Sequence, residues 1–250
     1  MKIAALSDIH SNAFALAAVI DDVKKRGVEQ MLNLGDIFYG PIAPKATFDI
    51  LKKHSFITIR GNQDRQICEA SQEEIDSNPT LRFVLDDLGK EPISWLKSLP
   101  FDNQIDDEIY MCHGTPNNDM EYLLENIETG FPCLRSDCEI MSALHGQSSN
   151  IIICGHTHIP RTVRIASGQL IINPGSVGLP AYTDDEPVAH AMENYCPHAS
   201  YAVIEKSKKG WTVQQIKVSY DYQEAVKMAK ERQRDDWGHF LNTGRRLDNG

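Results

Sequence analysis

The chain has 250 residues, of which 41% are hydrophobic and 24% charged, a composition that supports one domain with a full hydrophobic core. Its formal net charge of −10 and its lack of a basic stripe exclude nucleic-acid binding as the main function. The acidic balance still permits phosphate substrates, because bound divalent cations reverse the local field. We therefore expect a single domain over residues 1–250 whose partners are not nucleic acids.

The N-terminus predicts no signal peptide, because Met1 and Lys2 lead straight into a short strand. No apolar window approaches the length of a membrane span, so we expect no membrane contact. The six cysteines show no CxxC spacing and indicate free thiols in a reducing cytoplasm. Cys133 and Cys138 would suit zinc only as a loose pair without a partner pair.

The first third of the chain alternates short apolar runs with helical periodicity. Helices are predicted over 13–26, where Gly27 marks the end, and over 44–54. A mostly helical segment follows over 65–98. Strands are predicted between the helical segments, at 3–6, 30–34 and 57–60. This order favours an α/β fold whose first strands are parallel.

From Phe101 the pattern changes to short strands and turns. Two strands bracket the Asp106-Asp107 turn, and an isoleucine run at 151–153 predicts a buried strand. Two hairpins are predicted over 161–172 and 200–218, which suggests an antiparallel portion of sheet. Further predictions in chain order are helical pieces over 117–148, irregular chain over 181–199, a helix over 222–233 and then a polar tail.

Five of the predicted strands end in residue types that bind metal ions. In open α/β folds, sites form beyond the carboxyl ends of strands, so we expect these side chains to converge. Asp, Asn and His without thiolates suit Mn, Fe, Co, Ni or Zn. Seven ligands are too many for one tetrahedral zinc but suit two ions that activate a water and clamp a phosphoryl group. The seven residues are Asp8, His10, Asp36, Asn62, His113, His156 and His158.

Each of these residues also has a simpler interpretation. Asp8 and Asp36 could cap helices or form turns, Asn62 could be a left-handed turn residue, and His113 could be a satisfied strand-end histidine. The recurrence of such residues at five strand ends favours the metal interpretation. His190 and His198 lie in an irregular acidic segment, and we expect them to be surface residues.

The ordered motifs resemble the signature of the calcineurin-like metallophosphoesterases. The loop NPGSVG at 173–178 makes the chain similar to the small bacterial and archaeal phosphodiesterase branch. The match runs from residue 1 to about 178, and continues more weakly at 200–204 and around Asp236-Trp237. The motifs are Asp8-x-His10, Gly35-Asp36, Gly61-Asn62-x-Asp64, His113-Gly114 and Gly155-His156-Thr157-His158.

This resemblance implies a metallo-dependent phosphatase-like fold, a four-layer αββα sandwich of two mixed β-sheets flanked by helices. It implies a single metallophosphoesterase domain, with segments 65–98, 115–150 and 181–199 as candidate caps over the site. A homo-oligomer is compatible with it.

The resemblance also implies a dinuclear metal-dependent hydrolase of phosphoester bonds, a phosphodiesterase acting on a small phosphorylated substrate. A metal-bridging hydroxide would be the nucleophile, without a covalent enzyme intermediate. The cofactors would be two divalent ions, drawn from Mn, Fe, Ni, Co and Zn with Mn favoured. One ion is assigned to Asp8, His10, Asp36 and His158; the other is assigned to Asp36, Asn62, His113 and His156, so that Asp36 bridges the two.

Residues beside these ligands are expected to contact the substrate or support the site: Asn12, Gln63 and Asp64. Gln63 stands where many relatives have a histidine that is thought to protonate the leaving group. An amide can donate a hydrogen bond but is no proton donor near neutral pH, so good leaving groups are favoured. The alternatives are a dinucleoside polyphosphate hydrolase and a weakly catalytic, metal-bound scaffold for protein interaction.

Overall fold

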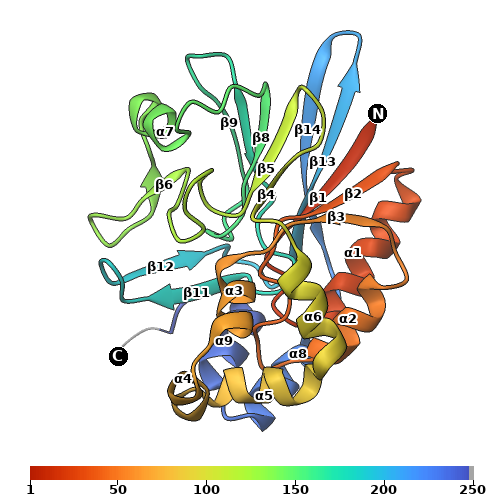
Figure 1. The fold of residues 1–250 in the computed structure, drawn as a ribbon, viewed down its shortest axis with the longest axis vertical. Helices are drawn as coiled ribbons and strands as arrows, with labels where there is room; N and C mark the ends of the chain where they lie inside the picture. Colours follow the sequence, from red (N-terminus) through yellow and green to blue (C-terminus); the bar gives the residue numbers. More distant parts are fainter. Residues whose placement is uncertain (248–250) are drawn as a thin grey trace.

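Two mixed five-stranded sheets form the centre of the protein in the computed structural model, which describes residues 1–247 (Figure 1). In each sheet three parallel strands lie together and antiparallel strands complete the sheet. The first sheet has the order β14 (Gly210–Val218), β13 (Ala199–Ser207), β1 (Lys2–Leu6), β2 (Gln30–Asn33) and β3 (Phe56–Thr58). The second has the order β4 (Asp102–Gln104), β5 (Ile109–Cys112), β8 (Ile151–Ile153), β10 (Leu170–Asn173) and β9 (Arg161–Arg164).

Helices cover the outer faces of both sheets, which confirms the expected arrangement of two mixed sheets flanked by helices (Figure 1). Most of them pack against the first sheet: α1 (Ala13–Lys25), α2 (Pro44–Leu51), α3 (Asn62–Glu69), α4 (Gln72–Ser77), α5 (Pro79–Leu88) and α6 (Lys90–Ser98). The second sheet is covered by α7 (Asp137–Ala143). Near the C-terminus α8 (Tyr222–Glu231) packs against α9 (Asp235–Thr243).

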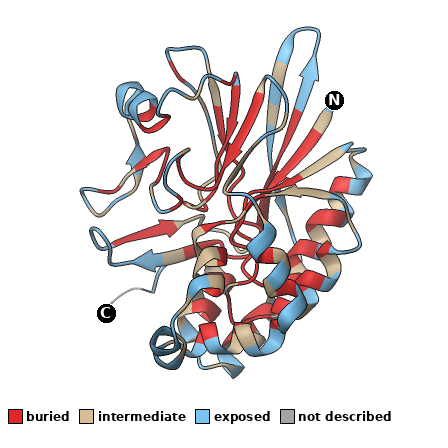
Figure 2. Cartoon of the chain, in the orientation of Figure 1, coloured by how far each residue is buried: buried red, intermediate tan, exposed pale blue. Residues whose placement is uncertain are grey.

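Strand alternation divides the hydrophobic core into layers. In β1, Ile3 and Ala5 face the second sheet, whereas Ala4 and Leu6 face the helices. This two-residue period is what a strand buried on both faces requires. Figure 2 shows the resulting band of buried residues along both sheets. The packing of the two sheets fixes the distance between their ends, and thus between the loops that follow the strands.

Two small hairpins lie beside the second sheet and form a lobe together with α7 (Figure 1). One consists of β6 (Glu125–Asn126) and β7 (Cys133–Leu134), and the other of β11 (Ala181–Asp184) and β12 (His190–Glu193). The expectation of irregular chain over 181–199 was therefore wrong for 181–184 and 190–193, which are strands. Residues 117–148 were expected to be helical in pieces, but only α7 is helical there.

The predicted polar tail after residue 233 was also wrong. These residues form α9, which buries Trp237, Phe240 and Leu241 against α8 and β11. The apolar residues lie three and four positions apart, which is a helical spacing, but the surrounding charges hide the pattern. The predicted hairpins over 161–172 and 200–218 are present as β9–β10 and β13–β14. Within residues 1–247, no helix is both long and apolar enough to cross a membrane.

The layer between the sheets should dominate stability. We expect Ile153→Ala, at a fully buried position between the sheets, to lower the free energy of unfolding by about 2–5 kcal/mol through lost burial and a cavity. Val188→Ala, at a position that is 39% exposed, is the control and should change it by less than about 0.5 kcal/mol. Urea denaturation midpoints measure both, and equal midpoints would contradict this description of the core.

Candidate metal centre

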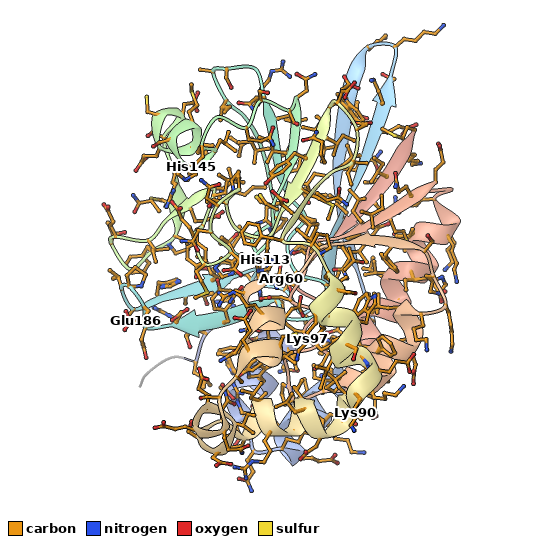
Figure 3. The ribbon with its side chains drawn as sticks, in the orientation of Figure 1. Arg60, Lys90, Lys97, His113, His145 and Glu186 are labelled. Atoms are coloured by element: carbon orange, nitrogen blue, oxygen red, sulfur yellow. The ribbon has the colours of Figure 1, made fainter. Side chains whose placement is uncertain are left out.

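The seven predicted ligands meet at one edge of the two sheets, where the carboxyl ends of parallel strands from both sheets come together. The loops are joined by main-chain hydrogen bonds, including Asp8 N to Gly35 O at 3.0 Å and Gly155 N to His113 O at 2.8 Å. Figure 3 shows His113 in the middle of the molecule. Five of the seven residues have left-handed backbone: Asp8 (φ 55), His10 (φ 48), Asp36 (φ 52), His156 (φ 69) and His158 (φ 60). Such strain concentrates at functional sites.

The first group of side chains contains Asp8, His10 and His158, all buried. Their ligand atoms lie within 4.8 Å of one another. The Nε2 atoms of the two histidines are 3.0 Å apart, and Oδ1 of Asp8 lies 3.4 Å from Nε2 of His158. That Oδ1 is buried and accepts no hydrogen bond from any residue within 1–247.

The second group contains Asp36, His113 and His156, and its ligand atoms satisfy the same 4.8 Å limit. Oδ2 of Asp36 lies 3.4 Å from Nε2 of His113, and Oδ1 of Asn62 lies 2.9 Å from the same nitrogen. Burial raises the pKa of Asp36, but the neighbouring His113 outweighs this effect, and the pKa falls below its usual range. Asp36 therefore remains an anionic oxygen donor.

The two groups fit divalent cations. Nδ1 of His10 lies 3.0 Å from the carbonyl of Tyr39, and Nδ1 of His158 lies 2.7 Å from that of Leu179. A carbonyl only accepts, so Nδ1 donates, and in the neutral rings Nε2 keeps a free lone pair. Burial and the nearby His158 lower the pKa of His10 to about 4, so this ring is neutral at pH 7. The Nε2 atoms of His10 and His158, which face each other beside the bare Oδ1 of Asp8, suit a cation between them.

Glycines in the motifs allow the loops to approach each other. A Cβ on Gly61 would overlap Oδ1 of Asp36, and one on Gly178 would overlap the main-chain carbonyl of Ile9. Gly178 N also donates to the carbonyl of Asp8 at 3.0 Å. These two glycines are needed because backbone and ligand loops are in direct contact.

The three residues predicted to contact substrate or support the site differ in their positions. Gln63 borders the cavity at the centre, and its backbone N donates to Oδ1 of Asp36 at 2.9 Å. Asp64 is buried and accepts from the main-chain N of Ile37 and Gly61 at 2.9 Å each, which holds the two loops together. Asn12 caps α1 and donates to the carbonyl of Gly178 at 2.9 Å. Asn12 and Asp64 therefore support the loops of the site, because their side chains bond to main-chain groups of those loops.

His190 was expected at the surface, and this expectation was wrong. Its side chain is buried, and Nε2 lies 2.9 Å from the hydroxyl of Tyr122. The Tyr122 hydroxyl also lies 2.9 Å from that of Tyr182, which donates to the carbonyl of His156 at 3.2 Å. The pairing of β11 with β12 brings these groups together. No local pattern in the sequence predicts this contact.

Aromatic rings surround the histidines. The Tyr122 ring is tilted against that of His156, with centroids 4.8 Å apart, and Tyr182 meets His158 edge-on at 4.6 Å. Trp237 of α9 meets the His10 ring edge-on at 5.8 Å. A cavity of about 240 Å³ lies between these rings and the two groups of ligands. The sequence did not predict that these aromatic rings line the cavity, because they come from three distant segments.

A family model for the calcineurin-like phosphoesterase superfamily domain matches residues 1–194. Over 97% of its length the chain is 26% identical to an uncharacterized protein of Methanocaldococcus jannaschii, of which the match covers 98%. A metallophosphoesterase from Sphaerobacter thermophilus has the same fold, with a TM-score of 0.75 at 24% identity over 98% of this chain and 100% of that one. The match over more than half of the chain shows that this protein belongs to the calcineurin-like phosphoesterase superfamily.

Proposed function

We propose that this protein is a phosphodiesterase with a two-metal site. The observation that supports this most is the pair of adjoining side-chain groups, Asp8–His10–His158 and Asp36–His113–His156, at one edge of the sheets. We assign Asn62 to the second group, because its Oδ1 points at His113. Asp36 is the proposed bridging ligand. When bound, divalent ions would supply Lewis acidity and an activated water.

The chain's own residues orient and enclose the substrate. The cavity of about 240 Å³ matches a phosphate group with small substituents, and aromatic rings form part of its wall. Gln63 borders this cavity, and its Oε1 accepts no hydrogen bond from residues 1–247. An amide at this position could donate an N–H to an oxygen of the substrate, but it delivers no proton.

The charges near the site favour a single phosphodiester over a polyphosphate chain. Among the described lining residues of the cavity, Arg234 is the only lysine or arginine, and two of its nitrogens donate to Asp236 at 2.9 and 2.7 Å. The guanidinium is thus largely neutralised. Dinucleoside polyphosphates carry several further negative charges that would meet no free cation here, so we favour diesters.

We also propose which metal is bound, which segments cap the site and that the protein is cytoplasmic. We propose Mn²⁺ as the working metal, since the oxygen- and nitrogen-rich donor set lacks thiolates. Segments 115–150 and 181–199 contribute lining residues to the centre and would cap it. Cys112 and Cys154 are buried free thiols, as expected in a reducing cytoplasm.

Hydrolysis of bis(p-nitrophenyl) phosphate tests the proposed function. We expect turnover with Mn²⁺ that disappears after EDTA treatment and returns when Mn²⁺ is restored, because bound divalent ions would activate the water. The release of p-nitrophenolate measures it. Protein that is folded by circular dichroism and loaded with metal, yet inactive, would instead support the scaffold alternative.

The ligand assignment predicts that His113→Ala removes one metal site. His113 is fully buried between Asp36 and Asn62, so its loss should lower bound metal from about two ions to about one per chain and reduce kcat by orders of magnitude. Elemental analysis of purified protein measures the metal. His145→Ala, at an exposed position, is the matched control and should retain both ions. A His113 variant with unchanged metal and rate would contradict the assignment.

Gln63→His should supply the missing proton donor. General acid catalysis is typically worth about 10²–10⁴-fold, so the variant should accelerate diesters with poor leaving groups most and those with good ones least. The measurement is kcat/KM for aryl phosphodiesters of graded leaving-group pKa. We expect a steep dependence in the natural protein and a flatter one in the variant. A flat dependence in the natural protein would mean that another group already donates the proton.

A further inference from the structure

The wall of the cavity at the centre contains an ion pair that the proposed metal ligands do not use. Arg234 and Asp236, at the start of α9, line this cavity of about 240 Å³ together with ligands such as His10 and His158. Both lie outside residues 1–194, which the family model matches. Their side chains are 29% and 38% exposed, so a molecule held at the centre can meet them.

Every nitrogen of the Arg234 guanidinium already has an acceptor. Nε and Nη2 donate to the two carboxylate oxygens of Asp236 at 2.9 and 2.7 Å, and Nη1 donates to the Thr80 hydroxyl at 2.6 Å. The group also lies over the Trp237 ring, 5.3 Å from its centroid, and that ring meets His10 edge-on. A cation one ring away from a proposed metal ligand is therefore held in a bidentate pair, a strong geometry for arginine and carboxylate.

This pairing offsets the positive charge that a phosphate would otherwise meet on the wall. Within residues 1–247, no other lysine or arginine lines the cavity, and Asp184 adds a further carboxylate. Away from the proposed ligands, the described wall therefore carries no net positive charge. A phosphodiester has one negative charge near neutral pH, whereas a monoester has about two. The second charge of a monoester would find no unpaired cation on this wall.

We propose that Asp236 determines the charge of the substrate that this centre accepts. By holding the Arg234 guanidinium, Asp236 withholds a phosphate-binding cation and makes the centre prefer monoanionic diesters to dianionic monoesters. This inference rests on the proposed phosphodiesterase function. The pair also ties the start of α9 to α5 through Thr80, but an anchor alone would affect diesters and monoesters equally.

Two substrates that differ by one methyl group test the inference on the Mn²⁺-loaded protein. They are methyl p-nitrophenyl phosphate, a monoanionic diester, and p-nitrophenyl phosphate, a monoester that is dianionic at about pH 8. Both release p-nitrophenolate, so the ratio of their kcat/KM values measures the selectivity. Comparing this ratio between protein variants cancels the intrinsic reactivity of the two esters.

Asp236→Asn keeps the size of the side chain but leaves Arg234 with an uncompensated charge. We expect it to raise the monoester-to-diester ratio about five- to twentyfold, because the additional negative charge of the monoester then interacts with the guanidinium in a cavity of intermediate dielectric constant. The gain should shrink as salt is added. Arg234→Gln should shift the ratio in the opposite direction, since it leaves the Asp236 carboxylate unpaired on the wall.

Asp235→Asn is the matched control. Asp235 lies in the same first turn of α9 and is exposed, but it does not line the cavity. The substitution removes the same charge from the same end of the helix and should leave the ratio unchanged. Thermal melting followed by circular dichroism establishes that each variant is folded.

Equilibrium binding gives a readout that does not depend on turnover. Phenylphosphonate and benzenesulfonate have similar shapes, but only the phosphonate carries a second negative charge at about pH 8. Isothermal titration calorimetry measures their affinities for the Mn²⁺-loaded protein. We expect Asp236→Asn to strengthen the binding of phenylphosphonate relative to benzenesulfonate by about the same factor as it changes the kinetic ratio.

The outcomes separate the two levels of the proposal. Suppose that the natural protein hydrolyses the diester, but that Asp236→Asn leaves the ratio unchanged or Asp235→Asn raises it equally. The inference is then overturned and the phosphodiesterase function stands. Parallel losses for both esters in the Asp236 and Arg234 variants would overturn it too, because they would reduce the pair to an anchor. No hydrolysis of the diester by the metal-loaded natural protein would overturn the phosphodiesterase proposal, and the inference with it.

Discussion

The candidate centre depends on hydrogen bonds between histidine rings and main-chain carbonyls. His10, His113 and His158 each direct Nδ1 at a carbonyl oxygen, those of Tyr39, Leu34 and Leu179, at 3.0, 2.8 and 2.7 Å. Each carbonyl belongs to a loop that follows a different strand from the one that precedes the histidine. The bonds fix the tautomer and the ring orientation, so Nε2 of each ring points into the site. Movement of either loop would misdirect a ligand.

This arrangement places buried polar groups and strained backbone at the same edge of the two sheets. Asp8, Asp36 and His113 are almost fully buried, and removing a charge from water is costly unless it is paired. Left-handed backbone at five of the seven predicted ligands adds a cost of about 1–3 kcal/mol each. The apolar layers between and around the sheets must offset these costs. Metal binding would stabilise the folded protein further, because cations would be coordinated by the imidazole nitrogens and would neutralise the carboxylates.

The sequence predicted the parts of this protein that depend on short-range pattern. Apolar runs ending in Asp, Asn or His located the ends of β1, β2, β3, β5 and β8, and the structure brings these ends together. The parallel centre of each sheet explains this success, since the carboxyl ends of parallel strands share an edge. Both long hairpins also follow from alternation and from turn glycines such as Gly210.

Features that depend on distant contacts could not be predicted in this way. His190 is buried because β12 pairs with β11 and brings it to Tyr122, a contact that its neighbours in the sequence do not specify. Helix α9 contains charges on its exposed face, and only the packing of Trp237 beside His10 makes it part of the centre. The cavity at the centre is formed by side chains from several loops, and a single sequence contains no local signal for such a space.

The central claim is that two metal ions lie between the two groups of ligands. Anomalous diffraction from crystals grown with Mn²⁺, recorded on both sides of the manganese absorption edge, tests this claim most directly. We expect two peaks of anomalous density, one at Asp8, His10 and His158 and the other at Asn62, His113 and His156, with Asp36 contacting both. A single peak, or peaks away from these residues in crystals of active protein, would contradict a two-metal centre at this edge.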